Sequence, residues 1–131
     1  MDICIASVMR NESLFLPYFY SNWISIPQIK HIILVDNGSE DSSISVARSL
    51  NIEVIEHSSE VDFNSIRNIS LLAAQKTNCA HILMVDVDEI PNLRCFSLFQ
   101  KLSENFSTVP FIGIPFYEGF CSKSVMWLES S

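Results

Sequence analysis

The chain has 131 residues, of which 48% are hydrophobic and 18% are charged. This composition predicts one globular domain, residues 1–131, and excludes a disordered chain or a charged tail. Its 8 basic and 15 acidic residues give a formal net charge of −7, and the basic residues do not cluster, so we expect no nucleic-acid partner. An acidic protein that handles phosphates needs a metal ion between the negative charges.

Short apolar runs alternate with longer helical patterns along the whole chain. Strands are predicted at residues 3–9, 31–35, 52–55, 80–85 and 111–116, and helices between Asn11 and Pro27 and at 40–50, 65–75 and 93–102. This alternation predicts an open α/β sheet that is mostly parallel and has helices on both faces. The fifth strand contains Pro115, which places it near an edge of the sheet.

Polar residues that favour caps and turns separate these elements. Asn11 is predicted to cap the first helix, which carries Pro17 in its first turns, where proline costs least. The segment Asp36-Asn37-Gly38-Ser39 is predicted to form a turn, with Ser39 as the cap of the second helix. In the last helix, Phe96, Phe99 and Leu102 are predicted to face inward.

The four cysteines, Cys4, Cys79, Cys95 and Cys121, stand apart, and none belongs to a CxxC pair. This spacing argues against zinc and favours buried thiols in a reducing compartment, with disulfides as the alternative. No targeting segment precedes the first strand, and no apolar run approaches the roughly 18 residues of a membrane helix. We therefore expect a cytoplasmic protein without a transmembrane segment, with peripheral attachment to a membrane as the alternative.

Polar side chains follow three of the predicted strands, at the edge where open α/β sheets bind ligands. They are Arg10, Asn11 and Glu12 after the first strand, Asp36 to Gly38 after the second, and Asp86, Asp88 and Glu89 after the fourth. If the backbone stays extended, Asp86 and Asp88 leave the same face about 6.5 to 7 Å apart at Cα. Such a carboxylate pair can bracket Mn²⁺ or Mg²⁺. The structural alternative is that Asp-x-Asp only ends the strand and caps the next helix.

Two further residues are candidates for contact with a nucleotide. Asp36 can accept hydrogen bonds from a nucleobase or a ribose, although its turn also has a purely structural interpretation. Arg67 is a surface charge unless the start of its helix faces a phosphate, which its guanidinium would hold. The sequence contains no GxSxG, GxGxxG or P-loop pattern, which argues against a serine hydrolase, a Rossmann dinucleotide site and a P-loop nucleotidase.

Three segments together resemble a known family. They are IASVMRNESLFLPYF at 5–19, IILVDNGSEDSS at 32–43 and ILMVDVDEIP at 82–91. They resemble the GT-A glycosyltransferases of the family 2 type, in particular the group with an N-E-x-x-x-L-P helix and a D-x-D-E metal motif. The resemblance covers almost the whole chain in order. It implies transfer of a sugar from a nucleotide-sugar donor to an acceptor hydroxyl.

The resemblance also implies roles for individual residues. Ser7 matches the position that touches the donor nucleoside, Asp36 the acidic residue that holds the base, and Arg67 a basic position near the donor. Asp86 matches the first D-x-D carboxylate, near the ribose and the metal, and Asp88 matches the metal ligand itself. The implied cofactor is Mn²⁺ or Mg²⁺, which would stabilise the leaving nucleoside diphosphate. The implied partners are a UDP-sugar or another nucleotide sugar, and an unknown acceptor, either a saccharide or a lipid-linked group.

The sequence departs from the family pattern in length. Family members continue past the fifth strand into an acceptor-binding half that carries the catalytic base of inverting enzymes. No residue here is recommended as that base, and Glu118 is a candidate by position alone. The expectation is a donor-binding half truncated after the fifth strand. It is a fragment, a chain whose partner supplies the acceptor half, or a non-catalytic remnant that acts as an interaction module. A nucleotidyltransferase is a further alternative, although it usually has a Gly-rich basic loop after its first strand.

Overall fold

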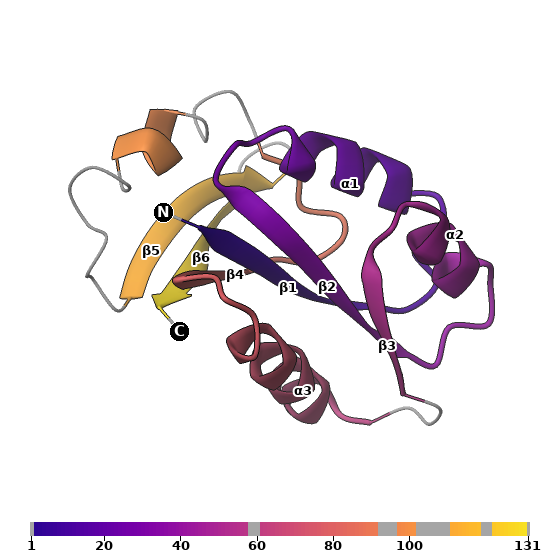
Figure 1. The fold of residues 1–131 in the computed structure, drawn as a ribbon. Helices are drawn as coiled ribbons and strands as arrows, with labels where there is room; N and C mark the ends of the chain where they lie inside the picture. Colours follow the sequence, from indigo (N-terminus) through magenta and orange to yellow (C-terminus); the bar gives the residue numbers. More distant parts are fainter. Residues whose placement is uncertain (1, 58–60, 92–96, 102–110, 119–121, 131) are drawn as a thin grey trace.

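A computed structural model of the chain describes residues 2–57, 61–91 and 97–101, and the backbone of residues 111–118 and 122–130 (Figure 1). Its elements are β1 (Ile3–Met9), α1 (Leu16–Ile24), β2 (Ile29–Asn37), α2 (Ser43–Ser49), β3 (Glu53–His57), α3 (Phe63–Gln75), β4 (His81–Met84), β5 (Phe111–Glu118) and β6 (Ser122–Ser130).

One six-stranded sheet of order β3-β2-β1-β4-β6-β5 organises the fold. The strands β3, β2, β1 and β4 are parallel, whereas β6 runs antiparallel to β4 and to β5. Helices α1 and α2 lie on one face of the sheet and α3 on the other (Figure 1). The predicted fold class, an open and mostly parallel sheet with helices on both faces, is therefore confirmed.

Alternating side chains of the central strands build a core on each face of the sheet. Ile3 and Ile5 of β1 belong to the larger core, together with residues of α1 and α2. Cys4 and Ala6, one position along, belong to the smaller core, into which α3 contributes Ala74. Because both faces are covered, β1 reads as a continuous apolar run, which is typical of a parallel strand.

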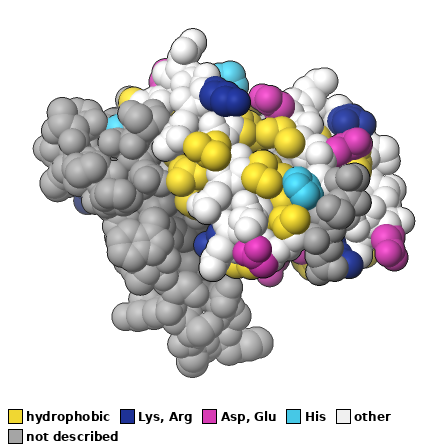
Figure 2. Space-filling view, turned by 90° about the horizontal axis from the view of Figure 1, so that it is seen from below, with side chains coloured by type: hydrophobic (Ala, Val, Ile, Leu, Met, Phe, Trp, Pro, Cys, Tyr) yellow, Lys and Arg dark blue, Asp and Glu magenta, His cyan; other side chains and the backbone are white. Residues whose placement is uncertain are grey.

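On the side of α3, hydrophobic side chains gather near the middle of the described surface, with charged ones around them (Figure 2).

Two predicted helix caps are wrong. Helix α1 begins at Leu16, with Phe15 at the N-cap, and α2 begins at Ser43, with Ser42 at the N-cap. Asn11, with a φ of 55°, accepts backbone hydrogen bonds from the loop that follows β2 instead. Ser39 Oγ accepts the backbone N–H of Asn11. The side chains of both residues join two loops and cap neither helix, because α1 begins five residues after Asn11 and α2 begins four residues after Ser39.

The C-terminal part differs in one element from the expectation. As Pro115 predicted, β5 is an edge strand, but β6, which lies between β4 and β5, was not predicted. Residues 97–101 are helical, and Phe99 is fully buried as predicted. The predicted positions of Phe96 and Leu102, like Cys95 and Cys121, lie outside the residues whose side chains are described. Glu118 lies at the end of β5, and its side chain is likewise outside the description.

The two described cysteines, Cys4 and Cys79, are buried thiols rather than disulfide sulfurs, in agreement with the expectation for them. Over the part of the chain that the structure describes, no helix is both long and apolar enough to cross a membrane.

Candidate functional site

A cleft with a volume of about 450 Å³ lies at the carboxyl edge of the parallel strands. This volume is within the range of small-molecule sites in proteins. Three loops and the start of α3 form its walls. The lining residues are Val8, Arg10, Glu12, Asn37, Val61, Asp62, Phe63, Asp86, Val87 and Asp88. Polar groups from the ends of β1, β2 and β4 therefore meet at one edge of the sheet.

The D-x-D segment is a turn and is not extended. The backbone N–H of Glu89 donates to the carbonyl oxygen of Asp86 at 3.0 Å, and the N–H of Asp86 donates to Oε2 of Glu89 at 3.1 Å. Val87 between the two aspartates is buried in the larger core. The condition for the predicted 6.5 to 7 Å Cα spacing is therefore not met, because burial of Val87 and the Glu89 contacts fold the segment. Asp86 and Asp88 nevertheless line the same cleft.

The cleft is negatively charged, and this charge contributes to a raised pKa of Glu12. Burial raises the pKa of Glu12 above its usual value, and the carboxylate of Asp88 raises it further. Smaller contributions in the same direction come from Asp41 and Asp86. Clustered carboxylates repel an anionic ligand, so a diphosphate needs a cation to bind here.

Arg67 reaches the site from the face of α3. Its Nη2 lies 3.1 Å from Oδ1 of Asp86, and its guanidinium carbon lies 4.4 Å from the centroid of the Phe63 ring. Both charged side chains are about two-fifths exposed, so the ion pair adds little to stability. Its main consequence is geometric: Arg67 ties the start of α3 to the first D-x-D carboxylate.

Ser7 and Asp36 lie at the same edge as the cleft but are not among its lining residues. Both are 2% exposed, and Ser7 lines a narrow crevice with Arg67 and Asp86. The side chain of Asp36 accepts the N–H of Ser39 through Oδ2. Among the described residues, the Oγ of Ser7 and the Oδ1 of Asp36 have no hydrogen-bond partner. Buried polar atoms usually have one, so these two atoms remain candidates for contact with a ligand.

The sequence analysis assigned no role to Val61 and Asp62, which form one wall of the cleft. Asn37 Nδ2 donates to the carbonyl oxygen of Val61 at 3.2 Å, and Oδ1 accepts the N–H of Val61 at 3.1 Å. Asp62 caps α3 by accepting the N–H of Ser65, so the helix begins at Phe63, two residues before its predicted start. An aspartate three residues before a serine, ahead of an apolar pattern, is a cap signal that would have located this wall.

Two loops of the cleft are joined by hydrogen bonds. The backbone N–H groups of residues 11, 12 and 13 donate to Ser39 Oγ, Ser43 Oγ and Asp41 Oδ2 respectively. In the other direction, Asn11 Oδ1 accepts the N–H groups of residues 40 and 41. The β1–α1 loop is thus held in place by the β2–α2 loop, and the N–H donors of residues 11, 12 and 13 are occupied.

The side chains present fit a metal that is shared with a substrate. Within the described residues, no group of three or more His, Cys, Asp or Glu side chains is arranged to hold a metal ion. Asp86 and Asp88 would supply carboxylate oxygens, and Oδ1 of Asp86 already accepts a hydrogen bond from Arg67. Magnesium-type sites with few protein carboxylates complete their shell with water and substrate phosphate.

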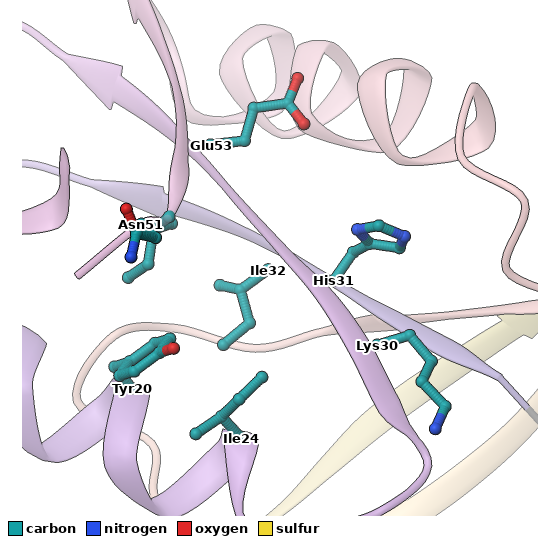
Figure 3. Close-up of a pocket in the computed structure, with 8 residues that line it drawn as sticks. Tyr20, Ile24, Lys30, His31, Ile32, Asn51 and Glu53 are labelled. Atoms are coloured by element: carbon teal, nitrogen blue, oxygen red, sulfur yellow. The ribbon is translucent and has the colours of Figure 1, made fainter.

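A second hollow of about 340 Å³ lies at the opposite end of the sheet, between α1 and the starts of β2 and β3. Figure 3 shows the residues that line it, among them Tyr20 and Ile24 of α1 and Ile32 of β2. None of the residues proposed for donor or metal binding lines this hollow.

Comparisons with known proteins bear on the family and the fold of the chain. The profile described as glycosyl transferase family 2 matches residues 4–123. The fold is similar to that of the mannosyltransferase PcManGT from Pyrobaculum calidifontis, solved with GDP-Man and Mn²⁺, with a TM-score of 0.63 and 14% identity. It is also similar to mannosyl-3-phosphoglycerate synthase from Rubrobacter xylanophilus, with a TM-score of 0.66 and 18% identity.

These matches cover 79% and 85% of this chain, but only 32% and 38% of the two enzymes. A cytidylyltransferase from Leptospira borgpetersenii serovar Hardjo-bovis is similar over 98% of this chain and 59% of its own length, with a TM-score of 0.67 and 14% identity. At these identities the solved structures establish the fold alone, and the chain spans about a third of the two glycosyl-transferring enzymes.

Proposed function

The chain belongs to glycosyl transferase family 2, and from this premise we propose that it binds the nucleotide-sugar donor of a metal-dependent glycosyl transfer. The reaction proposed for the complete catalytic unit moves the sugar from the nucleoside diphosphate to an acceptor hydroxyl. In this proposal residues 1–131 form the donor-binding half.

One observation carries the proposal: Asp86 and Asp88 line the same cleft as polar groups that follow two other parallel strands. Asp88, with Asp86 beside it, would hold Mn²⁺ or Mg²⁺ against the donor diphosphate. The bound ion supplies positive charge to the departing diphosphate. The solved complex of PcManGT with GDP-Man and Mn²⁺ supports the same pairing of nucleotide sugar and metal.

The chain's own residues have separable parts in this proposal. Asp86 is oriented by Arg67, which also lowers the negative charge of the cleft. Asn37 holds the backbone of Val61 at the wall of the cleft by a hydrogen bond. The linked β1–α1 and β2–α2 loops fix the position of Glu12. The contacts of Ser7 and Asp36 with the donor nucleoside remain predictions, which their unpartnered buried oxygens support.

Nucleotidyl transfer is the rival reaction on the same fold, and the cytidylyltransferase neighbour raises it. A loop that cradles phosphates needs free backbone N–H donors after the first strand. Here the N–H groups of residues 11, 12 and 13 already donate to side chains of the β2–α2 loop. The occupied donors favour glycosyl transfer over nucleotidyl transfer.

Calorimetric titration with UDP and GDP, in Mn²⁺ and in EDTA, tests the proposal. We expect binding of at least one nucleotide in Mn²⁺ and loss of that binding in EDTA. Asp88→Asn should abolish it, while the matched variant Asp2→Asn, at the far end of β1, should leave it unchanged. Binding that survives in EDTA or in Asp88→Asn would contradict the proposal.

Release of sugar from the bound donor then separates an enzyme from an inactive module. Slow hydrolysis of a UDP-sugar or GDP-sugar that requires Asp88 is expected of a catalytic chain. Donor binding without hydrolysis, and without transfer of the sugar to candidate acceptors, would favour the non-catalytic alternative.

A further inference from the structure

Among the described residues that line the cleft, Phe63 is the one aromatic side chain. It is the first residue of α3, its side chain is 56% exposed, and it lines the cleft beside Asp62 and Val61. Other large hydrophobic side chains are also exposed, but within the described residues none of them lines this cleft. They are Leu14, Phe15, Tyr18, Ile24, Leu72 and Ile90.

The Phe63 ring is fixed in position from behind. The Arg67 guanidinium carbon lies 4.4 Å from the ring centroid, and Arg67 is itself bound to Asp86 at 3.1 Å. One face of the ring is therefore covered by a cation, while Phe63 as a whole is 56% exposed. This chain of contacts sets an aromatic surface at a fixed place relative to the carboxylate that the proposed donor site uses.

We propose that the exposed face of Phe63 stacks against the nucleobase of the donor. The inference rests on the proposed function and extends it by naming a residue that stacks on the base. In a nucleotide sugar the base is the flat aromatic part, whereas the diphosphate is charged and belongs near the metal. A base that covers Phe63 removes apolar surface from water and stacks on a ring that Arg67 has already ordered.

Stacking on an aromatic ring tolerates different bases, because every base has a π face. The proposal therefore assigns Phe63 to affinity for a nucleotide and leaves the choice between uracil and guanine to hydrogen-bonding groups. The groups proposed for that choice are Asn37 and Asp36 at the end of β2. Asn37 lines the cleft, and Asp36 has a buried oxygen without a hydrogen-bond partner among the described residues.

Titration of Phe63 variants in Mn²⁺ tests the proposal with UDP, GDP, UDP-glucose and inorganic pyrophosphate as ligands. Phe63→Ala should weaken the nucleotide that the wild type binds by about 10- to 100-fold and leave pyrophosphate unaffected. Phe63→Tyr should keep near-wild-type affinity. Leu72→Ala, on the same helix and 59% exposed, is the matched control and should change nothing.

Tryptophan fluorescence of the variant Phe63→Trp provides a second test. Stacking of a base on the new indole should quench emission that the wild type, with Trp23 and Trp127, does not lose. Absence of quenching at saturating nucleotide would overturn the proposal.

Three results of the titration would overturn it as well. In the first, Phe63→Ala binds UDP and GDP as tightly as the wild type. In the second, it weakens pyrophosphate as much as nucleotide, which would make Phe63 a support for the metal site. In the third, it weakens UDP-glucose but not UDP, which would assign the ring to the sugar. If the wild type binds no nucleotide, the proposed function itself fails, so the two failures are distinguishable.

Discussion

The indole Nε1 of Trp23 donates a hydrogen bond to the carbonyl oxygen of Glu89 at 2.8 Å. Trp23 is a buried residue of α1, and Glu89 closes the turn that carries Asp86 and Asp88. A helix that is remote in sequence therefore holds the acidic turn against the larger core. The carboxylates of the proposed metal site are positioned by packing on the α1 side as well as by Arg67 on the α3 side.

Trp23→Phe should lower the free energy of unfolding by roughly 2–4 kcal/mol, because it removes core volume and leaves a carbonyl without its partner. Urea denaturation followed by circular dichroism measures this change. The control Tyr18→Phe, on the exposed side of the same helix, should stay within about 0.5 kcal/mol of the wild type. Equal stability of Trp23→Phe and the wild type would show that the indole contact does not hold the turn.

Asp41→Asn should destabilise the fold by about 1 kcal/mol, because Asp41 accepts hydrogen bonds from the Ser43 hydroxyl and from the N–H groups of Ser43 and Ser13. The hydrogen bond from the Ser43 hydroxyl is the main cause that lowers the pKa of Asp41. A lowered carboxyl pKa stabilises the fold above the unfolded value of 3.8, and that stabilisation is lost as the pH falls through the folded value.

The exposure of Asp41 keeps this pH-dependent part small, since solvent screens it. The neighbouring variant Glu40→Gln, also exposed, should have no effect. If Asp41→Asn unfolds at the same urea concentration as Glu40→Gln, the two cleft loops do not depend on this carboxylate.

His81 should make the fold less stable below about pH 6.5. The residue is 1% exposed, its ring nitrogens have no hydrogen-bond partner among the described residues, and burial lowers its pKa. The unfolded chain then takes up a proton that the folded chain refuses, so stability falls as the pH drops from 6.5 toward the folded pKa. The slope reaches at most about 1.4 kcal/mol per pH unit.

Urea denaturation between pH 7 and pH 5 measures the slope. His81→Gln should flatten it, and His31→Gln, at an exposed position of β2, should not. An unchanged slope in His81→Gln would assign the pH dependence to another group.

How much the sequence predicts depends on how many faces of an element are buried. The bounds of β1 were predicted exactly, because Ile3 to Met9 is an apolar run covered on both faces. The predicted end of β2, by contrast, was two residues short of Asn37. Side chains alternate between the faces of a strand, so Asp36 and Asn37 point to opposite faces. Because a turn was predicted at these two residues, the sequence did not indicate that Asn37 rather than Asp36 lines the cleft.

The remaining differences come from contacts that are distant in sequence. Asn11 reads as a helix cap because its own neighbours favour one, yet its partners lie near residue 40. The Phe63–Arg67 contact spans one helical turn, but the position of that turn depends on the Asp62 cap. Carboxylates at the ends of separate strands were predictable from topology, whereas the folding of Asp86–Glu89 into a turn depends on burial of Val87.

Alkylation should spare Cys4 in the folded protein. Burial is the main cause that raises the pKa of Cys4 to about 12, and burial also raises the pKa of Cys79. At pH 8 both groups stay protonated, and the thiolate is the reactive form. Peptide mass spectrometry after iodoacetamide should find both unmodified until urea unfolds the chain. Rapid modification of Cys4 in native buffer would contradict its burial.

Electron paramagnetic resonance of Mn²⁺ is the most direct test of a cation shared by Asp86, Asp88 and the donor diphosphate. The signal of free Mn²⁺ should fall only slightly when protein is added alone, because no three His, Cys, Asp or Glu side chains among the described residues are arranged to hold a metal ion. It should fall strongly when the nucleotide is added as well. With Asp88→Asn the signal should fall no further than it does with the nucleotide in the absence of protein. Strong Mn²⁺ binding without nucleotide, or an equal loss of signal in Asp88→Asn, would contradict the shared site.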